Sequence, residues 1–191
     1  VIILNFFASV AMIWGQDNPS LLQMAVPSLN IAPDARGGGM GDMGAATLPD
    51  INSQYWNAAK YAFMGSKAGV SLSYTPWLRK LVNDVALVNM TGYYKLGNSD
   101  LQAISASLRY FSLGEVNIWE NIGDVPYGLN PYEMAFDVAY SRKLSESYSM
   151  AVTLRYIRSD MGTDQKDESN AGNAFSADIS GYLEKYVLMG N

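Results

Sequence analysis

Residues 132–141 read YEMAFDVAYS, and this stretch decides the fold class. Every second side chain is large and apolar, while the side chains between them are small, polar or charged. Because successive side chains of a β-strand point to opposite faces, this period of two predicts a strand with one apolar and one polar face. The apolar face would carry Tyr132, Met134, Phe136, Val138 and Tyr140, and the polar face Glu133, Ala135, Asp137, Ala139 and Ser141.

The same alternation recurs elsewhere along the chain. Residues 148–156 repeat it and are expected to form a hairpin with the first stretch. The remaining alternating stretches are 70–74, 86–94, 104–110 and 175–179. The pattern therefore predicts an all-β protein with six antiparallel strands in residues 67–191.

Tyrosines mark the ends of the apolar faces. Tyr132 and Tyr140 bracket one strand, and Tyr148 and Tyr156 bracket the next. The other tyrosines at strand ends on this face are Tyr74, Tyr94 and Tyr110. Eight residues of strand cover about 26 Å, or about 20 Å along a bilayer normal at a tilt of ~40°. This length suits the apolar band between the aromatic girdles of an outer-membrane β-barrel, so we expect the apolar face to meet lipid.

The connections between the strands alternate in length. Residues 75–84, 112–130 and 158–172 form long connections, whereas 95–100 and 142–146 form short ones. Outer-membrane barrels have short periplasmic turns and long external loops, so the first strand is expected to run outward. A transmembrane barrel needs about eight strands or more, and we therefore expect these strands to be part of a larger barrel.

The residues before the strands differ from them. Residues 1–15 are an apolar run of the length found in signal peptides, and we expect a signal-peptide remnant there; a buried element at the start of a soluble domain is the alternative. Residues 16–66 are expected to form a plug. Within it, 33–44 is too rich in glycine for a regular element, and its glycines would let the backbone pass close to a barrel wall. Residues 50–63 have helical spacing, with Asp50 or Ser53 as the N-cap.

Composition excludes several classes of function. The chain has no Cys and no His, which removes thiolate and imidazole zinc sites and the Ser-His-Asp arrangement. Its formal net charge is −5 with no basic run, so no nucleic acid partner is expected. Asp137, Glu133 and Arg155 could meet on the polar wall, but they are interpreted as a charge ladder between strands. We expect no enzymatic activity and no cofactor.

Several runs, taken in order, resemble one family. They are IAPDARGGGMGD at 31–42, SQYWN at 53–57, LSYTPWL at 72–78 and SLRYFSLG at 107–114. They are similar to the PorV family of outer-membrane proteins of the type IX secretion system. That family is itself similar to the FadL transporters, whose barrels have about fourteen strands and an amino-terminal plug.

The resemblance implies that residues 67–191 are the first half of such a barrel. It also implies a plug motif made by Asp34, Arg36, Gly37, Gly38, Gly39, Gly41, Trp56 and Asn57. The chain departs from the family at Trp56-Asn57-Ala58-Ala59, where the family usually has Trp-Asn-Pro-Ala. The missing proline is expected to loosen the turn in the plug.

The resemblance further implies a shuttle in the cell outer membrane. Such a protein receives cargo with a C-terminal signal domain from the translocon barrel and passes it to the surface complex that removes the signal and attaches the cargo. Candidate partner-binding residues in the external loops are Pro76, Trp77, Leu78 and Trp119. For Trp77, anchoring in lipid headgroups is an equal alternative, and for Trp119 the headgroup belt or loop packing is favoured. The alternative function is a FadL-like transporter of small hydrophobic molecules, which would need an apolar pocket, whereas the inward faces are polar.

Overall fold

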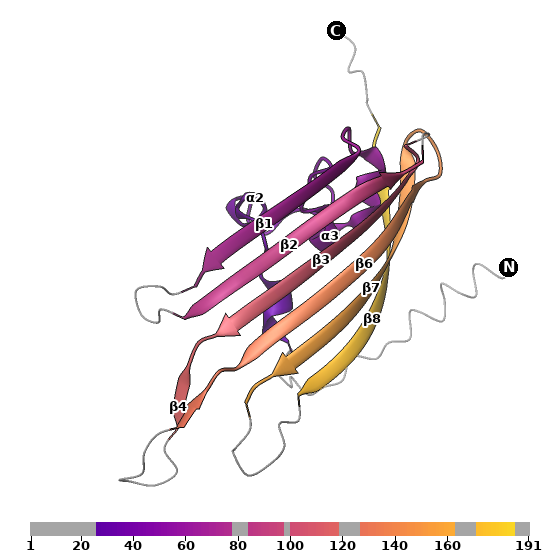
Figure 1. The fold of residues 1–191 in the computed structure, drawn as a ribbon. Helices are drawn as coiled ribbons and strands as arrows, with labels where there is room; N and C mark the ends of the chain where they lie inside the picture. The colour runs from indigo at the N-terminus through magenta and orange to yellow at the C-terminus, as the bar shows by residue number, and fades with distance from the viewer. Residues whose placement is uncertain (1–25, 78–83, 98–99, 119–126, 163–170, 186–191) are drawn as a thin grey trace, which may run out of the picture.

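The fold is that of a computed structural model, which describes residues 26–77, 84–97, 100–118, 127–162 and 171–185. Its main element is a curved antiparallel sheet of six strands in the order β1-β2-β3-β6-β7-β8 (Figure 1). The strands of this sheet are β1 Ala68–Pro76, β2 Val85–Leu96, β3 Gln102–Leu113, β6 Tyr132–Lys143, β7 Tyr148–Asp160 and β8 Gly172–Leu183. The predicted all-β class and the six strands of the sheet are confirmed.

The strands pair in one continuous register. Val138 on β6 lies opposite Ala106 on β3 and Leu154 on β7, while its neighbour Asp137 lies opposite Ser107 and Arg155. Because side chains alternate between faces, this register aligns apolar residues with apolar ones and polar residues with polar ones.

Burial in the sheet is the reverse of burial in a water-soluble protein. On β6, Phe136 and Val138 are 44% and 45% exposed, whereas Glu133 and Asp137 are 2% and 6% exposed. The same holds on β2, β3 and β7, where the buried polar residues include Asn89, Thr91, Ser105, Ser107, Arg109, Ser149 and Thr153. Large apolar side chains normally occupy the interior of a soluble domain and charged ones its surface. We call the exposed apolar side the outer face and the buried polar side the inner face.

The connections lie at the two ends of the sheet as the sequence predicted. Those after β1, β3 and β7 are at one end, which we call the long-loop end, and those after β2 and β6 are at the other (Figure 1). The connection expected over 112–130 is not a plain loop, since it contains a two-stranded hairpin of β4 Val116–Ile118 and β5 Tyr127–Leu129. Strands of three residues are too short to show an alternation, so the sequence pattern missed them.

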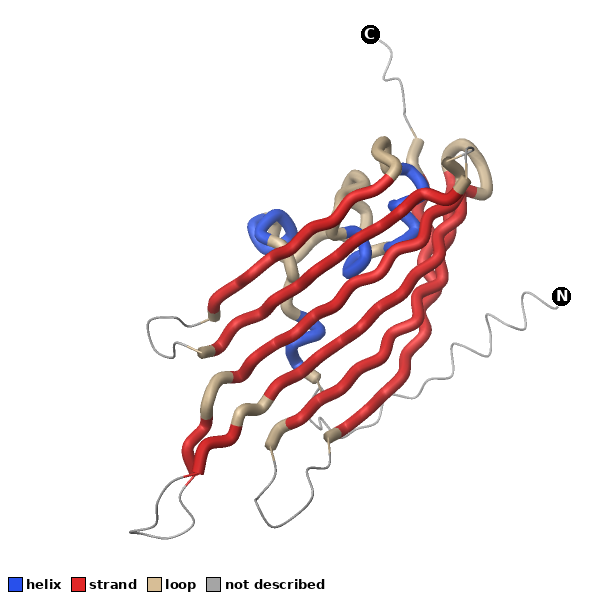
Figure 2. Tube along the Cα trace, viewed as in Figure 1, coloured by secondary structure: helices blue, strands red, loops and turns tan. Residues whose placement is uncertain are grey.

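Short helices within residues 27–63 cover the inner face (Figure 2), and we call this segment the plug. They are η1 Pro27–Asn30, α2 Ala35–Gly39, α3 Ser53–Trp56 and η2 Ala58–Phe63. The expectation that 33–44 contains no regular element is wrong, because α2 forms there. The helix predicted over 50–63 is divided into α3 and η2, because Asn57 between them has extended backbone angles, φ −167° and ψ 98°. Among the described residues, no helix is long and apolar enough to cross a bilayer.

The plug contacts the sheet through small side chains. Ala103, Ala139 and Ala151 of the inner face are at most 2% exposed and pack with Ala58, Ala59 and Tyr61 of η2. A methyl group is the smallest side chain that still excludes water, so these alanines allow the η2 backbone to come close to the strands. Tyr61 also stacks on Tyr93 of β2, with ring centroids 4.9 Å apart.

This packing predicts that the same substitution changes stability at one position of β6 and not at the adjacent position. Ala139→Phe puts a ring where η2 lies and should lower the free energy of unfolding by about 1–3 kcal/mol, as overpacking does. Val138→Phe enlarges an exposed residue of the outer face and should change it little. Urea unfolding of the protein in detergent micelles, followed by tryptophan fluorescence, measures both. Equal effects of the two substitutions would contradict the assignment of the faces.

Candidate functional site

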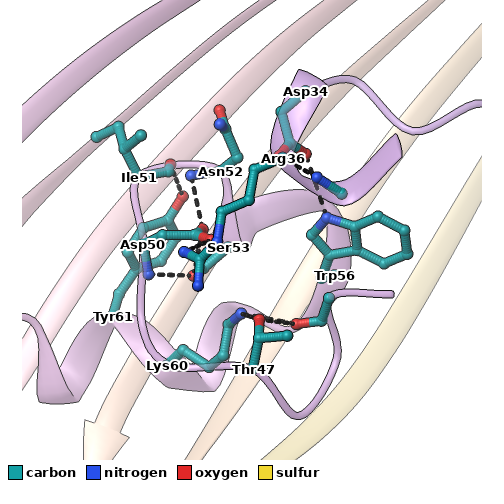
Figure 3. Close-up of polar contacts among 12 residues, drawn as sticks. Asp34, Arg36, Thr47, Asp50, Ile51, Asn52, Ser53, Trp56, Lys60 and Tyr61 are labelled. Atoms are coloured by element: carbon teal, nitrogen blue, oxygen red, sulfur yellow. Dashed lines mark hydrogen bonds and ion pairs between the residues drawn. The ribbon is translucent and has the colours of Figure 1, made fainter. Parts of the chain in front are cut away.

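Asp34 organises the beginning of the plug. Its Oδ2 accepts a hydrogen bond from the Gly37 backbone N–H at 2.8 Å, which caps the N-terminus of α2. Its Oδ1 accepts a hydrogen bond from the indole Nε1 of Trp56 at 3.3 Å. One carboxylate therefore holds α2 and α3 together (Figure 3). The cap also provides a physical reason why a short helix forms in a glycine-rich run.

Glycines are required where the plug backbone meets Trp56. A Cβ on Gly37 would lie 2.8 Å from the indole, and one on Gly44 would lie 2.3 Å from it. Gly41 has φ +75°, which disfavours other residues, whereas Gly38 and Gly39 would have no atom within 4 Å of an added Cβ. The glycines were expected to approach the barrel wall. That expectation is wrong for Gly37 and Gly44, because the group they approach is an indole of the plug itself.

Two cations join the loop before α3 to the helices of the plug. The half-exposed Arg36 forms an ion pair with Asp50, with Nη1 and Oδ2 2.9 Å apart. The fully buried Lys60 donates from Nζ to the Gly44 carbonyl at 2.7 Å and to Thr47 Oγ1 at 3.2 Å (Figure 3). Burial lowers the pKa of the Lys60 ammonium group, because leaving water disfavours the charged form. Lys60 thus holds the 44–47 turn against η2.

Asn57 connects the plug to β8. Its side-chain oxygen accepts from the Ala59 backbone N–H at 3.0 Å and caps η2. Its amide nitrogen donates to the Gly181 carbonyl of β8 at 3.0 Å and to the Ala45 carbonyl at 3.2 Å. The residue that interrupts the predicted helix is therefore also a bridge from plug to sheet.

The first turn of the plug, η1, is held by two charged residues of the inner face. The Ser28 N–H donates to Glu133 Oε2 at 3.0 Å, and Arg109 Nη1 donates to the Ser28 carbonyl at 2.8 Å. The Arg109 guanidinium also lies 4.5 Å from the ring centroid of Tyr55 on α3, in cation–π geometry. Buried charges are tolerated when they are hydrogen-bonded in this way.

The predicted charge ladder is only partly present. Arg155 and Asp137 lie opposite each other on β7 and β6 and form an ion pair at 2.6 Å. Ser107 donates to the same carboxylate at 3.2 Å. Glu133 does not join them, because it binds Ser28 of the plug instead. These groups connect strands and plug rather than converging on one reactive point.

The candidate partner-binding residues lie apart from the plug motif. Pro76 ends β1 at the long-loop end, and Trp77 follows it with 40% of its surface exposed. The Trp77 N–H donates to the Val85 carbonyl at 2.9 Å, which fixes the backbone there. Leu78 and Trp119 lie outside the described residues.

Sequence reasoning missed the residues that dock the plug. Ser28, Gln54 and Lys60 are buried polar residues of the plug, and Ser105 on the inner face donates to the Gln54 side-chain oxygen. A polar face on a strand indicates that something polar covers it, but the pattern does not say which residues do so. The sequence did contain one indication of these contacts, namely the polar residues that lie among the regularly spaced apolar residues of 50–63.

Comparison with known protein families gives a match that covers most of the chain. A family model described as type IX secretion system protein PorV matches residues 15–188. The chain belongs to the PorV family. No curated protein matches it. The PorV match extends from the plug to β8, so the motif residues and the inner face are parts of one family fold, and the protein is a component of the type IX secretion system.

Two neighbouring glycines of the PorV plug test the contact with Trp56. Gly37→Ala places a methyl carbon 2.8 Å from the indole, closer than van der Waals contact allows, and should loosen the plug. Gly38→Ala enters open space in the same helix and should be neutral or stabilise it by up to about 1 kcal/mol through helix propensity. Limited proteolysis of the folded protein, with the plug cleavage sites identified by mass spectrometry, should show faster cleavage only for Gly37→Ala.

The departure from the PorV family at residue 58 gives a second test. Asn57 is extended, as a residue before proline should be, and Ala58 is the first residue of η2, where proline is favoured. Ala58→Pro should therefore raise the free energy of unfolding by about 0.4–1 kcal/mol. Ala59→Pro is the control, and it should destabilise because it removes the N–H bonded to Asn57. Thermal unfolding in detergent that ranks Ala58→Pro below the parent would contradict this account of the turn.

Proposed function

We propose that the protein is an outer-membrane component of the type IX secretion system that shuttles cargo. In this proposal it takes proteins with C-terminal signal domains from the translocon barrel to the surface complex that removes the signal and attaches the cargo. The PorV match over residues 15–188 carries the proposal. The sheet would be the first half of a FadL-like barrel whose interior holds the plug.

The two faces of the sheet support the membrane location. The outer face exposes large apolar side chains, which costs free energy in water but not against lipid tails. Tyr74 and Tyr110 lie near its long-loop end, and Tyr94 and Tyr140 near its other end, as aromatic girdles do. The long-loop end would then face the cell exterior.

The plug that covers the middle of the inner face supports cargo handling by the loops rather than passage through the interior. Between the plug and the described inner face, a space of about 10 Å³ remains near Arg109 and Asp137. That is roughly room for one water molecule. A FadL-like transporter of hydrophobic molecules would need an apolar pocket there, yet the lining is polar. The charged residues Arg109 and Glu133 hold the plug in place, and we propose that the protein acts by binding and not by catalysis.

Affinity purification from detergent-solubilised outer membranes tests the shuttle. The protein should bring down cargo signal domains or the translocon barrel. Trp77→Ala should weaken capture about tenfold or more if this residue is a binding hot spot, since such residues contribute about 2 kcal/mol or more. Leu72→Ala is the matched control, because Leu72 is exposed on β1, the strand that Trp77 follows, but in the middle of the outer face.

Other results would count against the shuttle. Copurification of small hydrophobic molecules in the interior, without cargo or translocon, would favour the transporter. A protein that stays folded and dispersed in buffer without detergent would contradict the membrane location itself.

A further inference from the structure

Next to Arg158 on β7, the outer face carries an apolar groove. The groove has a volume of about 430 Å³, and its lining is mainly apolar: Phe136, Val138, Leu154, Tyr156, Phe175 and Ala177, together with Arg155 and Ser176. It arises because Ala177 of β8 is small while its neighbours on the same face are large. The groove is thus an apolar slot of the size that holds part of a small ligand.

Arg158 marks the long-loop end of this groove. It lies opposite Met134 on β6 and Asn173 on β8, one outward position beyond Tyr156, or about 7 Å along the strand. Its Nε donates to the Tyr132 hydroxyl at 3.1 Å, and Tyr132 stacks on Tyr110 of the same face. The guanidinium is therefore held at the tyrosine row and not directed into the inner face.

Arg158 differs from its neighbour Arg155 in its electrostatic partners. In the described part of the chain, Arg155 forms ion pairs with Asp137 and Asp178, and no ion pair includes Arg158. Arg158 is also a cation at the border of an apolar surface. A ligand with an anionic head and an apolar tail complements both the guanidinium and the apolar surface beside it.

We propose that the outer face of β6, β7 and β8 binds a phosphate-bearing lipid. Its acyl chain lies in the groove, and its phosphate accepts hydrogen bonds from the Arg158 guanidinium, whose planar donors match phosphate oxygens. The proposal rests on the outer-membrane location, in which the long-loop end, and with it Arg158, is at the level of the external lipid headgroups. Neighbouring residues add polarity there, since the Tyr156 hydroxyl donates to Asn173 Oδ1 at 2.7 Å.

The test distinguishes the contribution of the phosphate to binding from that of the acyl chains. Native mass spectrometry of the full chain in detergent micelles measures binding of dioleoyl phosphatidic acid, of dioleoylglycerol and of inorganic phosphate. The two lipids share their acyl chains and differ in the phosphate group. Phosphatidic acid should bind about fivefold more tightly than dioleoylglycerol, the difference expected for one arginine near an anionic headgroup. Inorganic phosphate alone should neither bind nor compete.

Three variants locate the site. Arg158→Gln should reduce phosphatidic acid binding about fivefold and leave dioleoylglycerol binding unchanged. Ala177→Phe fills the groove from an exposed position and should weaken both lipids. Arg142→Gln is the control, because Arg142 is exposed on the outer face of β6 at the opposite end. It removes the same charge and should change neither affinity.

Several outcomes would overturn the lipid site. They are equal affinities for the two lipids, equal losses in the Arg158→Gln and Arg142→Gln variants, competition by inorganic phosphate, or a protein chain in place of lipid on this face. A chain that does not enter micelles at all contradicts the outer-membrane location instead. The two failures are therefore distinguishable.

Discussion

The backbone of η2 rests on Ala103, Ala139 and Ala151, and this close contact positions the other plug bonds. Because the alanines keep the distance short, the Ser149 hydroxyl reaches the Ala59 carbonyl at 2.7 Å. Asn57 reaches β8 from the same turn. Further along, Glu133 and Arg109 bind both sides of the Ser28 peptide unit. The inner face is polar because a main chain, with its donors and acceptors, covers it.

The sequence predicted the sheet well because one simple constraint governs it. Alternation fixes which residues share a face, and the exposed Phe136 and Val138 beside the buried Asp137 follow directly from it. The plug was harder to predict. Asp34 stabilises a helix in a run of poor helix formers, while Asn57 interrupts a run with good helical spacing by capping η2. In both places a side-chain hydrogen bond to the backbone outweighs the helix propensity of the surrounding residues. The β4–β5 hairpin could not be predicted, because a strand of three residues is too short to show the alternation of apolar and polar side chains.

The PorV motif residues make contacts that build the plug and attach it to the sheet. Asp34, Gly37 and Trp56 form one cluster, and Asn57 joins it to the sheet. Their roles are structural, so the similarity that identifies the family reports how the plug is built. In the proposed shuttle role, partners would instead bind at the long-loop end, near the exposed Trp77.

The plug forms hydrogen bonds with four consecutive strands of the sheet, through Ser105 on β3, Glu133 on β6, Ser149 on β7 and Gly181 on β8. In the order of synthesis, it precedes all of them. One short segment that bonds to four strands fixes the positions of these strands relative to one another. The attachment of the plug is therefore shared among these strands, and the loss of one contact would leave the others in place.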